Sequence, residues 1–194
     1  MPKERLTAFT DGVIAIIITI MVLDLKVPAG GRWADLQPVI PVFLSYVLSF
    51  VYVAIYWNNH HHLMHAVTRV SGGILWANMH LLFWLSLVPF TTAWMGQRHF
   101  AQVPTAVFGV TLLMPAIAYY TLQLAIMWHQ GPHGKLAKAL GRDIKGKGSL
   151  VLYLIAIASC FYVVWVSHVI FVAVALIWLI PDRRIERALD RIEG

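Results

Sequence analysis

Apolar residues along this chain gather in long blocks, separated by short polar and proline-containing stretches. Four blocks hold about twenty residues or more, at Leu6–Leu25, Leu36–Trp57, Ser71–Met95 and Val103–Trp128. Two shorter blocks follow, at Ser149–Val166 and Ser167–Ile180. A helix of about 20 apolar residues can cross a hydrocarbon layer roughly 30 Å thick. The pattern therefore predicts an all-α, polytopic membrane protein with six transmembrane helices.

The last two blocks adjoin almost without a break, which predicts a tight helical hairpin, with a single broken helix as the alternative. Pro181 and Asp182 close the last block, Ser167–Ile180, and the charges after them alternate at helical spacing, as in a short solvated helix. We therefore expect residues 1–182 to form one six-helix transmembrane domain. Residues 183–194 would then form a short charged cytoplasmic tail.

The distribution of positive charge predicts the orientation in the membrane. Lys and Arg accumulate in cytoplasmic loops of membrane proteins. With the N-terminus placed inside, twelve of the 15 Lys and Arg residues fall on the cytoplasmic side, and only Lys26, Arg32 and Arg98 fall outside. Five spans would move the basic tail outside and weaken this contrast. The charges therefore favour six spans with both the N- and C-termini in the cytoplasm.

The low charge content excludes an ordinary soluble domain. Only 12% of the residues are charged and the mean hydropathy is +0.71, whereas soluble domains carry about 25% charged residues. The pI of about 9.7 is also typical of nucleic-acid-binding proteins, but the basic residues sit in predicted loops and the tail rather than on one folded face. We therefore expect a surrounding lipid bilayer and no nucleic acid.

The first apolar block begins with an unusual acidic group. Asp11 follows Thr10 and precedes Gly12 at the start of a predicted spanning helix. A carboxylate that faces lipid costs about 2.5–3.5 kcal/mol at mid-depth and less near the interface. Asp11 should therefore face protein or water and have a partner. The residues alone are equally compatible with a helix-start Thr and Asp that accept hydrogen bonds from backbone N–H groups.

Arg5, Phe9, Thr10, Asp11 and Gly12, followed by an Ile- and Thr-rich helix, resemble the signature of the transmembrane protein 175 family. This family comprises the endosomal and lysosomal potassium channels and their prokaryotic relatives. Thr10 stands where the family usually has Ser. Further downstream the resemblance continues in the motifs Trp57-x-x-His60-His61, Trp76-x-Asn78 and Pro89-Phe90-x-Thr92.

The resemblance implies a channel for potassium and other monovalent cations in a prokaryotic cell membrane. It implies a homotetramer in which the first helix of each subunit lines a central pore, and ions pass passively through apolar constrictions. The common potassium filter uses the carbonyls of a TVGYG loop, and the sequence contains no such stretch. That agrees with the family, whose constriction consists of apolar side chains.

The helical periodicity of the first block is compatible with a pore lining. At about 100° per residue, one stripe carries Gly12, Ile16, Thr19, Ile20 and Leu23, and Asp11 points away from it. Without the resemblance, such a stripe usually indicates helix packing. With it, Ile16 and Leu23 would form constriction rings, Thr19 a polar ring between them, and Ile20 part of the lining. Arg5, Phe9, Thr10 and Asp11 would belong to a structural or gating network.

A histidine cluster, His60, His61, His62 and His65, follows the second block. His61 and His65 lie four residues apart on one helical face, but a zinc site needs three or four ligands. We therefore expect no stoichiometric metal and no cofactor, and we interpret the cluster as interfacial histidines that bond locally or titrate near neutrality. The resemblance would bring His60 or His61 close to Asp11 or Asn78 and into the same network.

Other functions remain open at this point. A proton-conducting protein or a secondary transporter could use Asp11 and the His60–His65 cluster. A membrane enzyme with a histidine-bound metal is a further alternative, as is a structural membrane protein without flux. We do not expect an enzyme, because the serines lack a convincing His and Asp pattern for nucleophilic catalysis.

Overall fold

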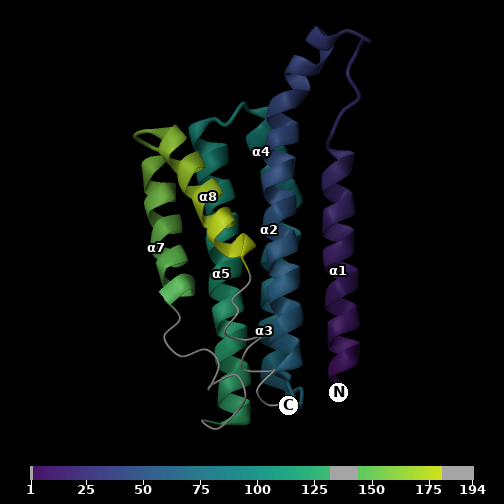
Figure 1. Cartoon of the computed structure of the whole chain (residues 1–194), viewed down its shortest axis with the longest axis vertical. Coiled ribbons are helices and arrows are strands. Elements are labelled where there is room, and N and C mark those ends of the chain that lie inside the picture. Colours follow the sequence, from purple (N-terminus) through teal and green to yellow (C-terminus); the bar gives the residue numbers. More distant parts are fainter. Residues whose placement is uncertain (1, 132–143, 181–194) are drawn as a thin grey trace.

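The computed structural model describes residues 2–131 and 144–180, and every regular element in these ranges is a helix. The helices form an elongated bundle along one axis (Figure 1). In chain order they are α1 (Lys3–Leu23), the 3₁₀ helix η1 (Trp33–Val39), α2 (Ile40–His65), α3 (Gly72–Ser86), α4 (Val88–Gln97), α5 (Gln102–Gln130), α7 (Ile144–Ser159) and α8 (Val164–Leu179).

The first four predicted spans agree with the structure to within a few residues, except at the end of the second, where the helix continues eight residues past Trp57 to His65. Four helical stretches are long and apolar enough to cross a membrane, and they comprise Lys3–Leu23, Trp33–His65, Gly72–Gln97 and Gln102–Gln130. The second stretch continues through the histidine cluster, which lies on the last turns of α2 rather than in a loop. The all-α class is therefore confirmed. The predicted tail lies outside the described residues.

The third span contains a break that the sequence analysis did not predict. Instead of one helix over Ser71–Met95, α3 ends at Ser86 and α4 begins at Val88, with Leu87 in a turn between them. Pro89 is the cause, because proline has no N–H for the helical bond and its ring disfavours a helical residue before it. The Thr91 N–H resumes the ladder by donating to the Leu87 carbonyl at 3.2 Å.

The last two helices form a hairpin, but the turn lies earlier than expected. Helix α7 ends at Ser159, and Ser167, the expected start of the last helix, already lies in the first turns of α8. The Ser167 hydroxyl donates to the Ala156 carbonyl at 2.7 Å, and the Cys160 thiol donates to the Ser167 oxygen at 3.2 Å. These bonds join the two arms. The boundary was mispredicted because the turn residues 160–163 are themselves mostly apolar.

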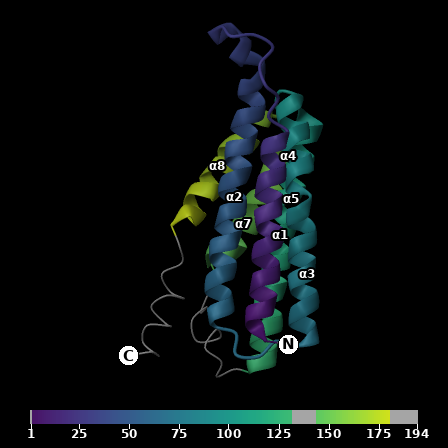
Figure 2. The ribbon, with the colours of Figure 1, turned by 90° about the vertical axis from the view of Figure 1, so that its right-hand side faces the viewer.

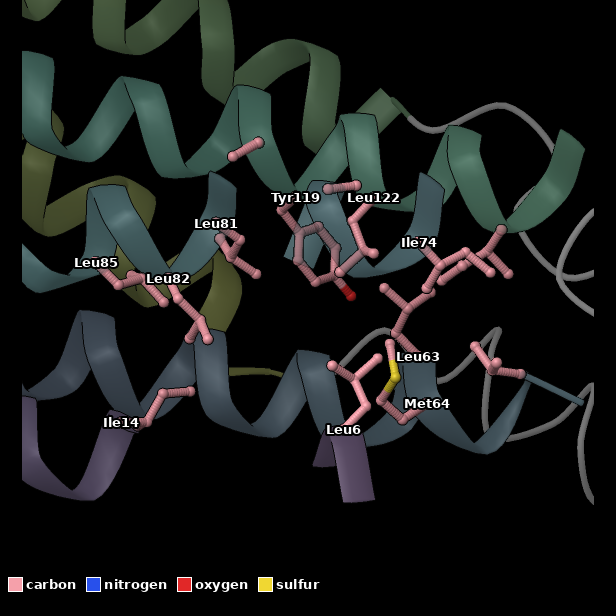
Figure 3. Packing of buried hydrophobic residues seen from close by; sticks show 14 of the residues in the cluster. Leu6, Ile14, Leu63, Met64, Ile74, Leu81, Leu82, Leu85, Tyr119 and Leu122 are labelled. Carbon is pink, nitrogen blue, oxygen red and sulfur yellow. The ribbon is translucent and has the colours of Figure 1, made fainter. Parts of the chain in front are cut away.

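Two apolar clusters hold the bundle together. Figure 3 shows the first, in which Leu6 and Ile14 of α1 lie close to Leu63 of α2 and Leu82 of α3. The second joins α2, α5, α7 and α8 around Phe108 and Phe171, whose rings meet edge to face at 5.7 Å between centroids. Helix α1 contributes only to the first cluster, and it stands at the outer side of the bundle (Figures 1 and 2).

Candidate functional site

Helix α1 has one buried face, which attaches it to the bundle. Its buried residues recur every three or four positions, as expected for one face of an α-helix: Leu6, Thr10, Ile14, Ile17 and Met21. They lie against α2 and α3, and the aliphatic members belong to the first cluster. The sequence therefore fixes which side of α1 faces the rest of the chain.

The opposite face of α1 is apolar and uncovered within the single chain. Ile16 is 58% exposed, Ile20 46% and Leu23 80%, and Thr19 between them is also exposed. The Thr19 hydroxyl donates to the Ile16 carbonyl at 2.9 Å, so the lone pairs of its oxygen stay available as acceptors. A side chain added at Gly12 would meet nothing within 4 Å. These are the five positions of the predicted stripe.

Arg5 and Phe9 extend this exposed face toward the beginning of α1. Both side chains are exposed, and Phe9 is 53% accessible. Arg5 lies eleven residues before Ile16, which at about 100° per residue returns it to nearly the same angle. Within residues 2–131 and 144–180, the Arg5 side chain makes no ion pair. The structure thus places Arg5 and Phe9 on the uncovered stripe, away from the polar contacts of Thr10 and Asp11.

Three polar side chains meet in the apolar contact between α1, α2 and α3. The Asn78 amide donates to the Thr10 hydroxyl at 2.9 Å, and its oxygen lies 2.9 Å from His60 Nε2. Thr10 and Asn78 are 0% exposed and His60 is 1% exposed. Because the Asn78 oxygen can only accept, His60 carries its proton on Nε2. Nδ1 of His60 is buried without a partner among the described residues.

Asp11 has a different partner, the indole of Trp57 on α2. Trp57 Nε1 donates to the Asp11 carboxylate at 2.9 Å, and the Trp57 ring lies 6.1 Å from the His61 ring. This bond was not predicted from the sequence. The available signal was its place in Trp57-x-x-His60-His61, because Trp57 lies about one helical turn before His60 and therefore on the same side of α2.

An apolar groove runs between α1 and the junction of α3 and α4. Its walls are Val13, Ile16 and Ile20 on one side and Pro89 and Phe90 on the other. Phe90 is 63% exposed. The groove therefore continues the uncovered face of α1 across a second element, and no side chain from residues 2–131 or 144–180 fills it.

The described residues hold no group of three or more His, Cys, Asp or Glu side chains that could bind a metal ion. His61 and His65 form a pair, with their Nε2 atoms 3.1 Å apart. On α1 itself, the exposed face is thus an apolar stripe with one hydroxyl, that of Thr19.

Comparison with known proteins points to one group. Residues 5–89 match the family model described as endosomal/lysosomal potassium channel TMEM175. The chain is 54% identical over 189 residues to a potassium channel of Chryseobacterium sp. strain P1-3, covering 97% of this chain and 98% of that one. A potassium channel of Chamaesiphon minutus is 30% identical over 180 residues, with 84% and 86% coverage.

A solved structure and a more distant sequence are similar to the chain as well, and both are described by the same family name. The crystal structure described as a lysosomal potassium-selective channel TMEM175 homolog from Chamaesiphon minutus matches with a TM-score of 0.77 at 28% identity, covering 93% of this chain and 97% of that chain. The mouse protein named endosomal/lysosomal proton channel TMEM175 is 28% identical over 146 residues. The match spans 67% of this chain and only 29% of the mouse protein.

Proposed function

Because this chain belongs to the TMEM175 potassium channel family, we propose that it conducts cations passively, with a preference for potassium, through a central pore lined by α1. It is a member of a channel family and not of an enzyme family. The observation that carries the proposal is the uncovered stripe. A helix that buries one face and exposes Ile16, Ile20 and Leu23 on the other has a surface suited to a pore between subunits.

The proposed pore requires several copies, because one bundle with a single exposed stripe encloses no path. We propose a homotetramer in which the four α1 helices surround the axis, with the groove beside Pro89 and Phe90 receiving α1 of the adjacent copy. Each stripe position then becomes a ring of four side chains. The bacterial relatives and the basic loops support a multi-pass position in a prokaryotic cell membrane, with both termini in the cytoplasm.

The mechanism follows from the chemistry of these rings. Four Ile16 or Leu23 side chains offer a cation no oxygen to replace its hydration shell, and an uncompensated charge in apolar surroundings is costly. The rings therefore resist ions until they widen, as hydrophobic constrictions do. The Thr19 ring between them provides hydroxyl oxygens. Potassium passes more readily than sodium because the larger ion holds its water less strongly.

The polar contacts would then set the position of α1 rather than carry ions. Asn78 holds Thr10 and His60 together, and Trp57 holds Asp11. Polar groups in a membrane bundle that bond to each other fix the register of neighbouring helices. Both contacts lie off the exposed stripe, so we assign them to assembly and gating.

Reconstitution in planar bilayers under a potassium/sodium gradient tests this proposal. We expect an ohmic, non-saturating current whose reversal potential lies toward the potassium equilibrium potential. A saturable, coupled flux would instead indicate a transporter, and a protein without current would refute the channel.

Proton conduction is a second candidate, since the mouse relative is named a proton channel and His60 Nδ1 lies buried beside α1 without a partner among the described residues. The same bilayers under a pH gradient separate the two. A reversal potential that follows the proton gradient at constant potassium would favour protons as the main ion.

A further inference from the structure

Two histidines, His61 and His65, lie on the exposed side of the last turns of α2, with their Nε2 atoms close together. The proposed channel function does not involve this pair. We propose that His61 and His65 form an exchangeable site for one divalent transition-metal ion. Both side chains are exposed, and their Nε2 atoms lie 3.1 Å apart. The ring centroids are 4.6 Å apart, so both nitrogens face the same small volume.

The distance between the nitrogens matches metal ligation. Bonds from a zinc ion to imidazole nitrogen are about 2.0–2.1 Å long. Two such bonds that end on nitrogens 3.1 Å apart enclose an angle of about 100° at the metal. That angle lies between the octahedral and tetrahedral values, so the separation of the two nitrogens already suits one ion, and the rings need only turn until both lone pairs point at it. The i, i+4 spacing on a continuous helix keeps the pair on one face.

The number of ligands defines what kind of site this is. Among the described residues no third His, Cys, Asp or Glu joins the pair. With water in the remaining coordination positions, the ion would exchange and would not be retained through purification. Imidazole favours zinc, copper and nickel, whereas magnesium and calcium prefer oxygen. Binding requires both Nε2 lone pairs, so the ring that now donates from Nε2 must instead carry its proton on Nδ1. Acid therefore weakens binding.

The site lies next to a contact that positions α1. The His61 ring is 6.1 Å from the Trp57 ring, and Trp57 Nε1 donates to Asp11 of α1. A metal that fixes His61 and His65 stiffens the turns of α2 that hold α1. A bound ion should therefore lower the current by restraining α1. This consequence for current rests on the proposed channel function, whereas binding itself does not.

Binding is tested with the untagged, purified full chain by thermal unfolding during titration with nickel chloride. We expect nickel to raise the unfolding temperature of the wild-type chain. In His61→Gln or His65→Gln, the nickel concentration that gives half of this rise should be at least about tenfold higher than in wild type. His129, exposed at the end of α5, supplies the matched control His129→Gln, which should behave as wild type. Nickel should act at lower concentration than cobalt, and cobalt lower than manganese.

Several outcomes would overturn the proposal. The first is that nickel stabilises the double variant H61Q/H65Q as much as wild type. The second is that magnesium stabilises the wild-type chain as much as nickel does. The third is that His129→Gln weakens the nickel effect as much as the His61 and His65 variants do. Without metal, each variant must unfold at the same temperature as wild type. If His61→Gln does not, His61→Asn takes its place. In bilayers, saturating nickel should reduce wild-type current and leave H61Q/H65Q unaffected. Binding with equal currents would refute the coupling to α1, and a chain without current would leave the binding result standing.

Discussion

Truncation of Ile16 is the sharpest test of the pore lining, because the structure separates its effect on conduction from its effect on folding. Replacing a buried Ile by Ala costs about 2–5 kcal/mol. Ile16 is 58% exposed within the chain, so Ile16→Ala should cost about 1 kcal/mol or less in subunit stability. Ile18 is partly buried and packs against the first cluster, so Ile18→Ala should destabilise more while leaving the stripe intact.

The expected effect on current is large, because a tetramer multiplies the change. Ile16→Ala removes three carbons from each of four side chains at the same height in the pore. Lowering the barrier to permeation by only about 0.7 kcal/mol raises the rate about threefold, so we expect at least that increase in single-channel current. Discrimination between potassium and sodium should fall, because the ion keeps more of its water. Ile16→Asn should also raise the current, since its amide can solvate the ion.

The assay compares Ile16→Ala with Ile18→Ala in planar bilayers at matched protein density, with thermal unfolding measured on the same preparations. Ile18→Ala should change stability and leave conductance near wild type. If both variants keep wild-type conductance and selectivity, or if Ile18→Ala has the larger effect on current, then α1 does not line the pore as proposed.

Three further predictions concern topology and the polar contacts. Single cysteines at Arg98 and Lys145 should be labelled from opposite sides of the membrane, and labelling from one side would contradict the six-span topology. Asp11→Ala removes the acceptor of Trp57 Nε1 and should impair assembly or gating more than selectivity. Native electrophoresis measures assembly, and the reversal potential measures selectivity. A normal tetramer with normal gating and an altered reversal potential would place Asp11 in the ion path. Asn78→Ala deprives two buried groups of their bonds and should cost about 1–3 kcal/mol, seen as a lower unfolding temperature; an unchanged temperature would refute that contribution.

Sequence reasoning worked best where a single physical constraint acts over many residues. The lengths of the apolar blocks predicted the four long spans to within a few residues, apart from the end of the second, because membrane thickness sets that length. The helical repeat of α1 likewise separates the exposed positions from the buried ones. The same arithmetic places Arg5 on the exposed stripe, although the resemblance assigned Arg5 to the polar network.

Features that depend on one residue or on tertiary contact were harder to predict. The break at Leu87 follows from Pro89, but proline is tolerated inside many transmembrane helices, so its presence alone did not determine the break. The start of α8 before Ser167 depends on hydrogen bonds across the hairpin. The bond between Trp57 and Asp11 joins residues 46 positions apart. The motif places Trp57 on the same side of α2 as His60, but it does not identify Asp11 as the partner.

The short hairpin has a consequence for the surrounding lipid. Helix α5 has 29 residues and α7 and α8 have 16 each, which correspond to about 43 Å and 24 Å of rise. In the six-span topology predicted from the sequence, these two helices would be spans about 6 Å shorter than a typical hydrocarbon layer, and a bilayer adapts to such a mismatch by thinning locally. Acyl-chain length would then act on α7 and α8, at the edge of the subunit that lies opposite α1 (Figure 1).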